Sequence, residues 1–135
     1  MSLLNIQYCP STLAEGFDTY SPATLRRMFN GRKVSHILDF DPPTIDNEVA
    51  NRFRINQYNM SISGAQTKQS LVLDKNKLRL TETSERGAYI LKPIPNNRLF
   101  ANAAELPANE HLTMQIARQV FGIDTAENAL IFFKN

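Results

Sequence analysis

Residues 70–81 read Ser-Leu-Val-Leu-Asp-Lys-Asn-Lys-Leu-Arg-Leu-Thr, and this stretch does most to decide the fold. Its two halves, residues 70–74 and 77–81, are strand-like runs that carry apolar residues and end in polar ones. They flank the pair Lys75 and Asn76, which suits a tight two-residue turn. The sequence therefore predicts an antiparallel β-hairpin at this point of the chain.

A third strand, a helix and a last strand are predicted after the hairpin. Residues 88–92 form a short apolar run. Residues 107–121 read as a helix, because Pro107 suits its first turn and Gly122 suits its end. Residues 128–133 are dense in apolar residues and predict a last strand. This order predicts an α+β fold in which one helix packs on a small, mostly antiparallel sheet.

A short helical lead-in is predicted before the sheet, over residues 1–58. Ser21 can cap the free backbone amides of a helix, and Pro22 fits its first position. Asp41, followed by two prolines, repeats this pattern and predicts a second short helix. The remainder, residues 59–135, holds the predicted strands and the long helix. We expect the two parts to form one structural unit.

Composition narrows the class of protein. The chain has 135 residues, of which 42% are hydrophobic, so it can form one domain with a core. The net charge is only +2, and no basic run suggests direct contact with nucleic acid. No stretch approaches the ~20 apolar residues of a membrane helix, and the first residues lack the basic segment and apolar run that are typical of a signal peptide. A single cysteine, Cys9, also suits a reducing compartment, so we expect a cytoplasmic protein without membrane contact.

A polar loop before the hairpin is the first candidate binding feature. Small residues let backbone amides approach a phosphate closely, and a lysine would add positive charge. With one glycine the loop matches neither of the common phosphate-binding patterns, so on its own it reads more simply as a solvated loop. The candidate residues are Ser61, Ser63, Gly64, Ala65, Gln66 and Lys68.

Lys92 and Glu110 are the next candidates. Lys92 ends an apolar strand, where a lysine snorkelling at a sheet edge is the common alternative to a functional role. Glu110 lies in the first turn of the predicted helix and heads an apolar line with Met114, Ala117 and Phe121. A carboxylate turned towards a core needs a positive partner, although a glutamate at a helix start can simply face water. We expect an ion pair between Lys92 and Glu110.

The predicted helix carries a second apolar line, formed by Leu112, Ile116 and Val120 at a spacing of four residues. Because both lines are apolar, much of this helix is apolar, and the line headed by Glu110 is expected to be the buried one. The two histidines of the chain, His36 and His111, are interpreted as polar surface residues. We assign them no catalytic or metal-binding role, and we predict no metal site in this chain.

The order of these parts is informative. A small-residue loop precedes a hairpin, a strand carries a lysine, a helix carries a glutamate, and a strand follows. The N-terminal lobe of protein kinases has the same order, and there the strand lysine pairs with the helix glutamate and contacts phosphates. The usual kinase loop has three glycines, so an ordinary protein kinase matches poorly.

Three local strings resemble the HipA/HipT family of bacterial toxin Ser/Thr kinases. They are Met60-Ser-Ile-Ser-Gly-Ala-Gln-Thr-Lys68, Tyr89-Ile-Leu-Lys-Pro93 and Glu105-Leu-Pro-Ala-Asn-Glu-His111. The stretch of residues 122–131 is also similar to the segment that precedes the hinge in that family. Together these strings are specific for the family, whereas any one of them alone would not be.

The resemblance implies a role for each candidate residue. Residues 61–68 would cover ATP, Lys92 would contact its phosphates, and Glu110 would orient Lys92. Ser61 and Ser63 would be candidates for autophosphorylation. The complete kinase would use ATP with Mg²⁺ to phosphorylate a protein Ser/Thr, with an aminoacyl-tRNA synthetase as the expected target, and would arrest growth. Its expected partners are a HipB-like DNA-binding antitoxin and a HipS-like small protein.

The chain also departs from the family. The catalytic aspartate, its companion asparagine and the Mg-binding aspartate would all lie beyond Asn135. We therefore expect this chain to be inactive alone and to need a catalytic C-terminal lobe, on the same parent chain or on a separate polypeptide. The end just after an apolar run favours a truncated lobe. The alternative is a stand-alone regulatory module that binds a partner kinase lobe or an antitoxin.

Overall fold

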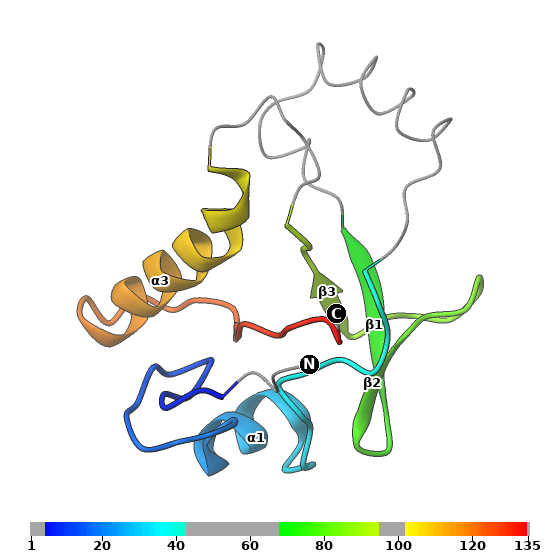
Figure 1. Ribbon diagram of the computed structural model, residues 1–135, viewed down its shortest axis with the longest axis horizontal. Helices are drawn as coiled ribbons and strands as arrows, with labels where there is room; N and C mark the ends of the chain where they lie inside the picture. Colours follow the sequence, from blue (N-terminus) through cyan, green and yellow to red (C-terminus); the bar gives the residue numbers. More distant parts are fainter. Residues whose placement is uncertain (1–4, 43–67, 95–101, 135) are drawn as a thin grey trace.

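The computed structural model describes residues 5–42, 68–94 and 102–134. Figure 1 shows three strands on one side, a long helix on the other, and the C-terminal segment between them. The prediction of an α+β fold with a small antiparallel sheet, one packed helix and a short helical lead-in is confirmed. The elements are α1 (Pro22–Phe29), β1 (Gln69–Asp74), β2 (Lys77–Leu80), β3 (Tyr89–Leu91), the 3-10 turn η2 (Ala103–Glu105) and α3 (Leu106–Gln119).

The sheet has the order β2-β1-β3, and both pairs of neighbouring strands are antiparallel. Asp74 lies opposite Lys77, so the connection is the predicted two-residue turn. Lys75 adopts the left-handed conformation, with φ of 56°, as tight hairpin turns require. On the other side of β1, Ser70 lies opposite Ile90. The predicted hairpin is confirmed.

The predicted helix at Ser21 is also confirmed. The hydroxyl oxygen of Ser21 accepts a hydrogen bond from the backbone amide of Thr24 at 3.3 Å, and Pro22 is the first residue of α1. Asn30 ends the helix in the left-handed conformation, with φ of 54°. The second helix predicted after Asp41 lies outside the described residues.

One hydrophobic core joins the lead-in to the sheet. The rings of Tyr20 and Phe29 lie 5.3 Å apart, and Phe29 lies 5.8 Å from the ring of Tyr89 on β3. The hydroxyl of Tyr89 donates a hydrogen bond to the Met28 carbonyl at 2.6 Å. One face of the sheet is therefore covered by α1 and its flanking loops. The buried apolar residues of this core are Tyr20, Phe29, Val34, Leu38, Leu71, Leu78 and Leu91.

The prediction of a strand over residues 128–133 is wrong. This segment is extended, but among the described residues its only β-bridge is the isolated parallel one between Ile37 and Phe132. Its amides bond to irregular loops, with Leu130 donating to Pro10 and Phe132 donating to His36, each at 2.9 Å. Those loops are not strands, so no ladder can propagate along the segment. The apolar run is buried by packing on the lead-in instead.

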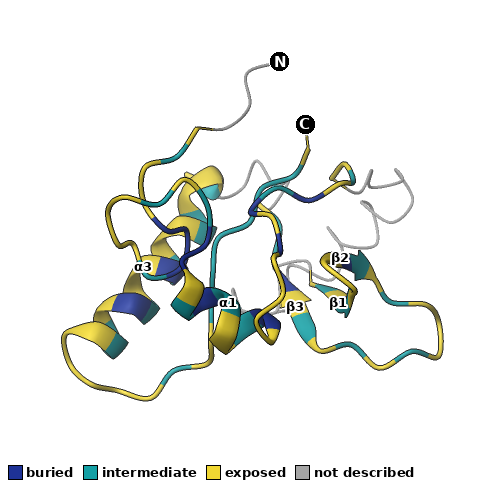
Figure 2. Ribbon diagram, turned by 90° about the horizontal axis from the view of Figure 1, so that it is seen from below, coloured by how far each residue is buried: buried dark blue, intermediate teal, exposed yellow. Residues whose placement is uncertain are grey.

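The prediction of the long helix is confirmed in position. The helix α3 begins at Leu106, so Glu110 lies in its second turn rather than its first. The line of Glu110, Met114 and Ala117, expected to face the core, is half-buried, whereas Phe121 at its end is 70% exposed. The second apolar line, Leu112, Ile116 and Val120, is 47%, 42% and 70% exposed. The buried residues of α3 are His111 and Gln115, and Figure 2 shows the buried parts of this helix in dark blue.

Two further expectations concern the histidines, and both are wrong. His36 and His111 are buried, at 8% and 5% exposure. The ring of His36 lies edge-on to Phe132 and accepts or donates a hydrogen bond to the hydroxyl of Thr19 at 3.2 Å. Histidine is amphipathic enough to fill such sites when a polar partner is near.

Within the described ranges, no helix is long and apolar enough to cross a bilayer.

Candidate functional site

Lys92 and Glu110 meet in the structure, as the sequence predicts. The ammonium nitrogen Nζ of Lys92 lies 2.5 Å from the carboxylate oxygen Oε1 of Glu110. The two side chains are 36% and 41% exposed, so the pair is open to solvent on one side. An ion pair of this exposure contributes only about 0–1 kcal/mol to stability. Its main effect is therefore to fix the position of the lysine.

The local fold explains why these two residues meet. Lys92 directly follows β3, whose last residue, Leu91, is buried in the core. Pro93 cannot donate a ladder hydrogen bond, so the strand ends beside Lys92. Glu110 lies on α3, which is held against the C-terminal segment by a hydrogen bond of 3.0 Å from Gln115 Nε2 to Asn128 Oδ1. The end of β3 thus fixes the position of Lys92, and the packing of α3 on the C-terminal segment fixes the position of Glu110.

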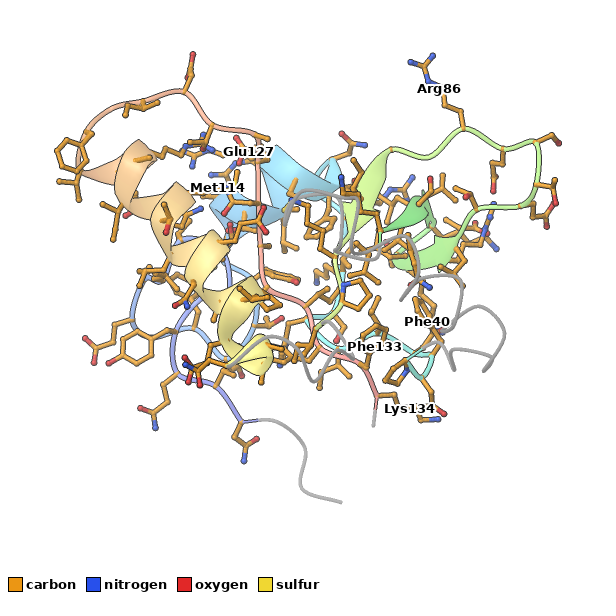
Figure 3. The ribbon with its side chains drawn as sticks, turned by 90° about the horizontal axis from the view of Figure 1, so that it is seen from above. Phe40, Arg86, Met114, Glu127, Phe133 and Lys134 are labelled. Atoms are coloured by element: carbon orange, nitrogen blue, oxygen red, sulfur yellow. The ribbon has the colours of Figure 1, made fainter. Side chains whose placement is uncertain are left out.

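A cavity of about 420 Å³ adjoins this pair. Its walls are β3, α3 and the extended segment of residues 126–131. Met114 and Glu127 both line it, and Figure 3 shows Met114 on the side of α3 that faces the segment containing Glu127. A mostly apolar cavity with a few polar groups at its rim is the usual form of a small-molecule site.

A second lysine lies near the end of β3. Lys68 directly precedes β1 and Lys92 directly follows β3, so the two residues flank the end of the ladder at which Gln69 lies opposite Leu91. Ser70 and Ile90 form the next pair of this ladder. Ile90 is 71% exposed and Lys68 is exposed, so this end of the sheet is open to solvent. Two cations at an open end of the sheet favour an anionic ligand.

His111 lies beside this pair at the back of the cavity. Burial lowers its pKa, and the neighbouring Asn128 side chain and Ser11 backbone only partly oppose that effect. Neither ring nitrogen has a well-aligned hydrogen-bond partner among the described residues. A buried imidazole with a lowered pKa is neutral at pH 7, so His111 adds no charge to the site.

The predicted site residues fall into two groups. Ser61, Ser63, Gly64, Ala65 and Gln66 lie outside the described residues. Lys68, Lys92 and Glu110 are described, and the structure brings Lys92 and Glu110 into contact. No cluster of metal-ligating side chains occurs in the parts of the chain that the structure describes.

Sequence reasoning missed three residues that border the site. Ile90 could have been found, because it shares the alternating strand face of Lys92. His111 follows Glu110 directly, but its burial depends on how the helix is rotated. Asn128 has no sequence signal, because it meets α3 only through the path of the C-terminal segment.

Neither a protein-family model nor a curated protein matches this chain. The functional case therefore rests on the geometry of its own residues. That geometry defines a class of site in which a lysine, oriented by a glutamate, lies at the edge of an open sheet face and beside a cavity.

Proposed function

We propose that this chain is the N-terminal, nucleotide-binding lobe of a HipA/HipT-like Ser/Thr kinase. The observation that carries the proposal is the 2.5 Å contact between Lys92 on the sheet and Glu110 on the packed helix. In kinase lobes this pairing orients a lysine towards nucleotide phosphates. The sheet order, the helix that follows it and the local strings quoted above support the same reading.

The physical role of the pair follows from its exposure. A lysine free in solvent samples many rotamers and loses that freedom when it binds an anion. Glu110 orders the Lys92 side chain beforehand, while the exposed side of the ammonium group stays available to a phosphate. Lys68, which directly precedes the adjacent strand β1, would add a second positive charge.

In the complete kinase, the lobe would hold ATP and the accompanying Mg²⁺ against a catalytic C-terminal lobe. That lobe would position a protein Ser/Thr, with an aminoacyl-tRNA synthetase as the proposed target. The present chain would be inactive alone. Phosphate added to Ser61 or Ser63 would bring up to two negative charges to the loop and oppose nucleotide binding. HipB-like and HipS-like proteins are the proposed inhibitory partners.

A second candidate function is a stand-alone module that binds another protein. The observation in its favour is the exposed apolar line of Leu112, Ile116 and Val120. Such a module would need no nucleotide. Nucleotide binding at Lys92 therefore separates the two functions.

The test is a titration of the full chain with Mg-ATP, in which binding is monitored by NMR chemical shifts and by calorimetry. Wild-type protein should bind weakly, with shifts centred on Lys68 and Lys92. Lys92→Met should lower the affinity at least tenfold. Lys77→Met is the matched control, because Lys77 forms a similar pair with Asp39 at 3.3 Å, with side chains 74% and 56% exposed.

The same titration is then repeated with a HipT-like C-terminal lobe and a phosphorylation assay. Tighter binding and phosphoryl transfer only in the mixture would support the kinase lobe. Absence of nucleotide binding by a folded chain in both conditions would favour the protein-binding module.

A further inference from the structure

The cavity beside the Lys92–Glu110 pair is large enough to enclose a small molecule. We call it the β3–α3 cavity, and Figure 1 shows β3 and α3 with the C-terminal segment between them. Its volume of about 420 Å³ falls within the range of roughly 300–1,000 Å³ that is usual for ligand sites. Roughly 150 Å³ is already enough to hold benzene. The cavity therefore has room for a molecule of one or two rings.

The lining of the β3–α3 cavity is rich in aromatic rings and thioethers. The rings of Tyr20, Phe29 and Tyr89 line it, together with the side chains of Met28 and Met114. Aromatic rings pack favourably against one another, and the sulfur of methionine makes favourable contacts with ring edges. A lining of this composition favours a flat aromatic ligand.

The charged and phenolic groups that line the cavity are already paired. The hydroxyls of Tyr20 and Tyr89 donate to backbone carbonyls at 2.7 and 2.6 Å. Lys92 is paired with Glu110, and Glu127 accepts a hydrogen bond from an arginine guanidinium at 2.8 Å. Because each charge in the lining has an opposite charge beside it, the cavity favours a neutral ligand.

One polar side chain of the lining, His111, lacks a partner. It is 5% exposed, and neither ring nitrogen has a well-aligned hydrogen bond among the described residues. The amide of the neighbouring Asn128 already accepts from Gln115 at 3.0 Å and donates to the Ala126 carbonyl at 2.8 Å. A neutral imidazole offers one N–H donor and one acceptor nitrogen. A ligand that bonds to either nitrogen would remove the cost of burying it unpaired.

We propose that the β3–α3 cavity binds a neutral aromatic molecule of one or two rings, with one polar group that forms a hydrogen bond with His111. A triphosphate does not suit this apolar lining. A purine base does not suit it either, because most of its ring nitrogens would be buried without partners. The site is thus separate from the proposed contact of Lys92 with phosphate.

Titration of the full chain with indole, monitored by NMR chemical shifts, tests the site. Indole should bind saturably and shift the signals of His111 and Met114. The compound 1-methylindole has the same rings but no N–H donor, so it should bind about tenfold more weakly. Adenine should also bind more weakly than indole, because its additional polar atoms find no partners.

Two variants locate the ligand within the cavity. In His111→Leu the hydrogen bond is lost, so indole and 1-methylindole should bind within about twofold of each other. Met114→Trp places a larger side chain in the cavity and should abolish indole binding. Ile116→Trp is the matched control, because Ile116 lies on the same helix at 42% exposure and does not line the cavity. Circular dichroism shows whether each variant remains folded.

The titrations contain no nucleotide, so their outcome does not depend on binding of Mg-ATP. Preference for indole that His111→Leu removes, with binding that Met114→Trp abolishes and Ile116→Trp retains, supports the proposal. The proposal is overturned by a folded wild-type chain that does not bind indole or that binds adenine more tightly. It is also overturned by a preference that survives His111→Leu, or by folded Met114→Trp protein that still binds indole.

Discussion

The two faces of the sheet differ in what covers them and in the residues they carry. On the covered face, Leu71 and Leu78 pack with Phe29 of the lead-in. On the open face, Ile90 is 71% exposed, and Lys68 and Lys92 lie next to the strand ends nearest to it. Burial of one face therefore stabilises the fold, while the other face remains free to bind a ligand. Variants on the two faces should therefore affect different measurements.

The largest effect is expected on the covered face. Phe29 is 1% exposed and contacts the rings of Tyr20 and Tyr89. Phe29→Ala should lower the free energy of unfolding by about 3–5 kcal/mol, because it leaves a cavity in the core. Urea unfolding followed by circular dichroism measures this change. A loss below about 1 kcal/mol would show that the lead-in does not stabilise the sheet.

The lead-in should also make stability depend on pH through Cys9. Burial raises the pKa of this thiol. Hydrogen bonds with the side chains of Thr12 and Thr24 and with the backbone of Ser21 and Ser11 lower the pKa by more than burial raises it, so that it falls to about 6. The folded pKa is thus below that of the unfolded chain, near 9. Stability should therefore rise between pH 6 and pH 9, because the unfolded chain binds the thiol proton over that range and the folded chain does not.

Urea midpoints across that pH range measure this rise, with Cys9→Ser as the comparison. The variant lacks a thiol that titrates, so its profile should be flatter. An equally steep profile for the variant would assign the effect to another group.

A smaller pH effect is expected at α3. Burial lowers the pKa of His111, so the unfolded chain binds a proton more readily than the folded one. The stabilising effect is complete above the ordinary value of 6.5 and is lost as the pH falls below it. His111→Leu should reduce the acid sensitivity, measured by thermal unfolding at pH 7 and pH 5. An unchanged acid sensitivity would contradict the burial of a neutral imidazole.

The smallest effect on stability is expected on the open face. Ile90→Ala removes a side chain that is mostly in solvent, so the free energy of unfolding should change by less than about 0.5 kcal/mol. Matched urea curves for Ile90→Ala and Phe29→Ala compare the two faces directly. A loss at Ile90 comparable to that at Phe29 would mean that the open face is covered in solution.

The parts of the fold that short-range chemistry specifies could be predicted from sequence. The turn at Lys75 and the cap at Ser21 depend on neighbouring residues alone, and both are found as expected. Neither feature needs knowledge of distant segments. The contact of Lys92 with Glu110 joins residues 18 positions apart, and it was expected from the order of parts shared with kinase lobes, in which a strand lysine pairs with a helix glutamate.

The rest depends on long-range contacts. Periodicity turned the line of Glu110, Met114 and Ala117 towards the core, and this line is half-buried, but it gave no signal that the polar residues His111 and Gln115 beside it would be buried. Gln115 is held there by its bond to Asn128, thirteen residues away on a segment that itself has no regular structure. The same segment was predicted as a strand because an apolar run does not reveal whether its partner is a strand or a loop. Residues 61–67 of the predicted phosphate loop lie outside the described ranges.

The central claim is that Lys92 serves to bind phosphate and not only to hold Glu110. A charge exchange, Lys92→Glu with Glu110→Lys, tests this most directly. It keeps an ion pair, but it places the positive charge on α3 and the negative charge after β3. We expect the exchanged protein to unfold within about 1 kcal/mol of wild type and to lose Mg-ATP binding in an NMR titration. Nucleotide binding that survives the exchange unchanged would contradict the account.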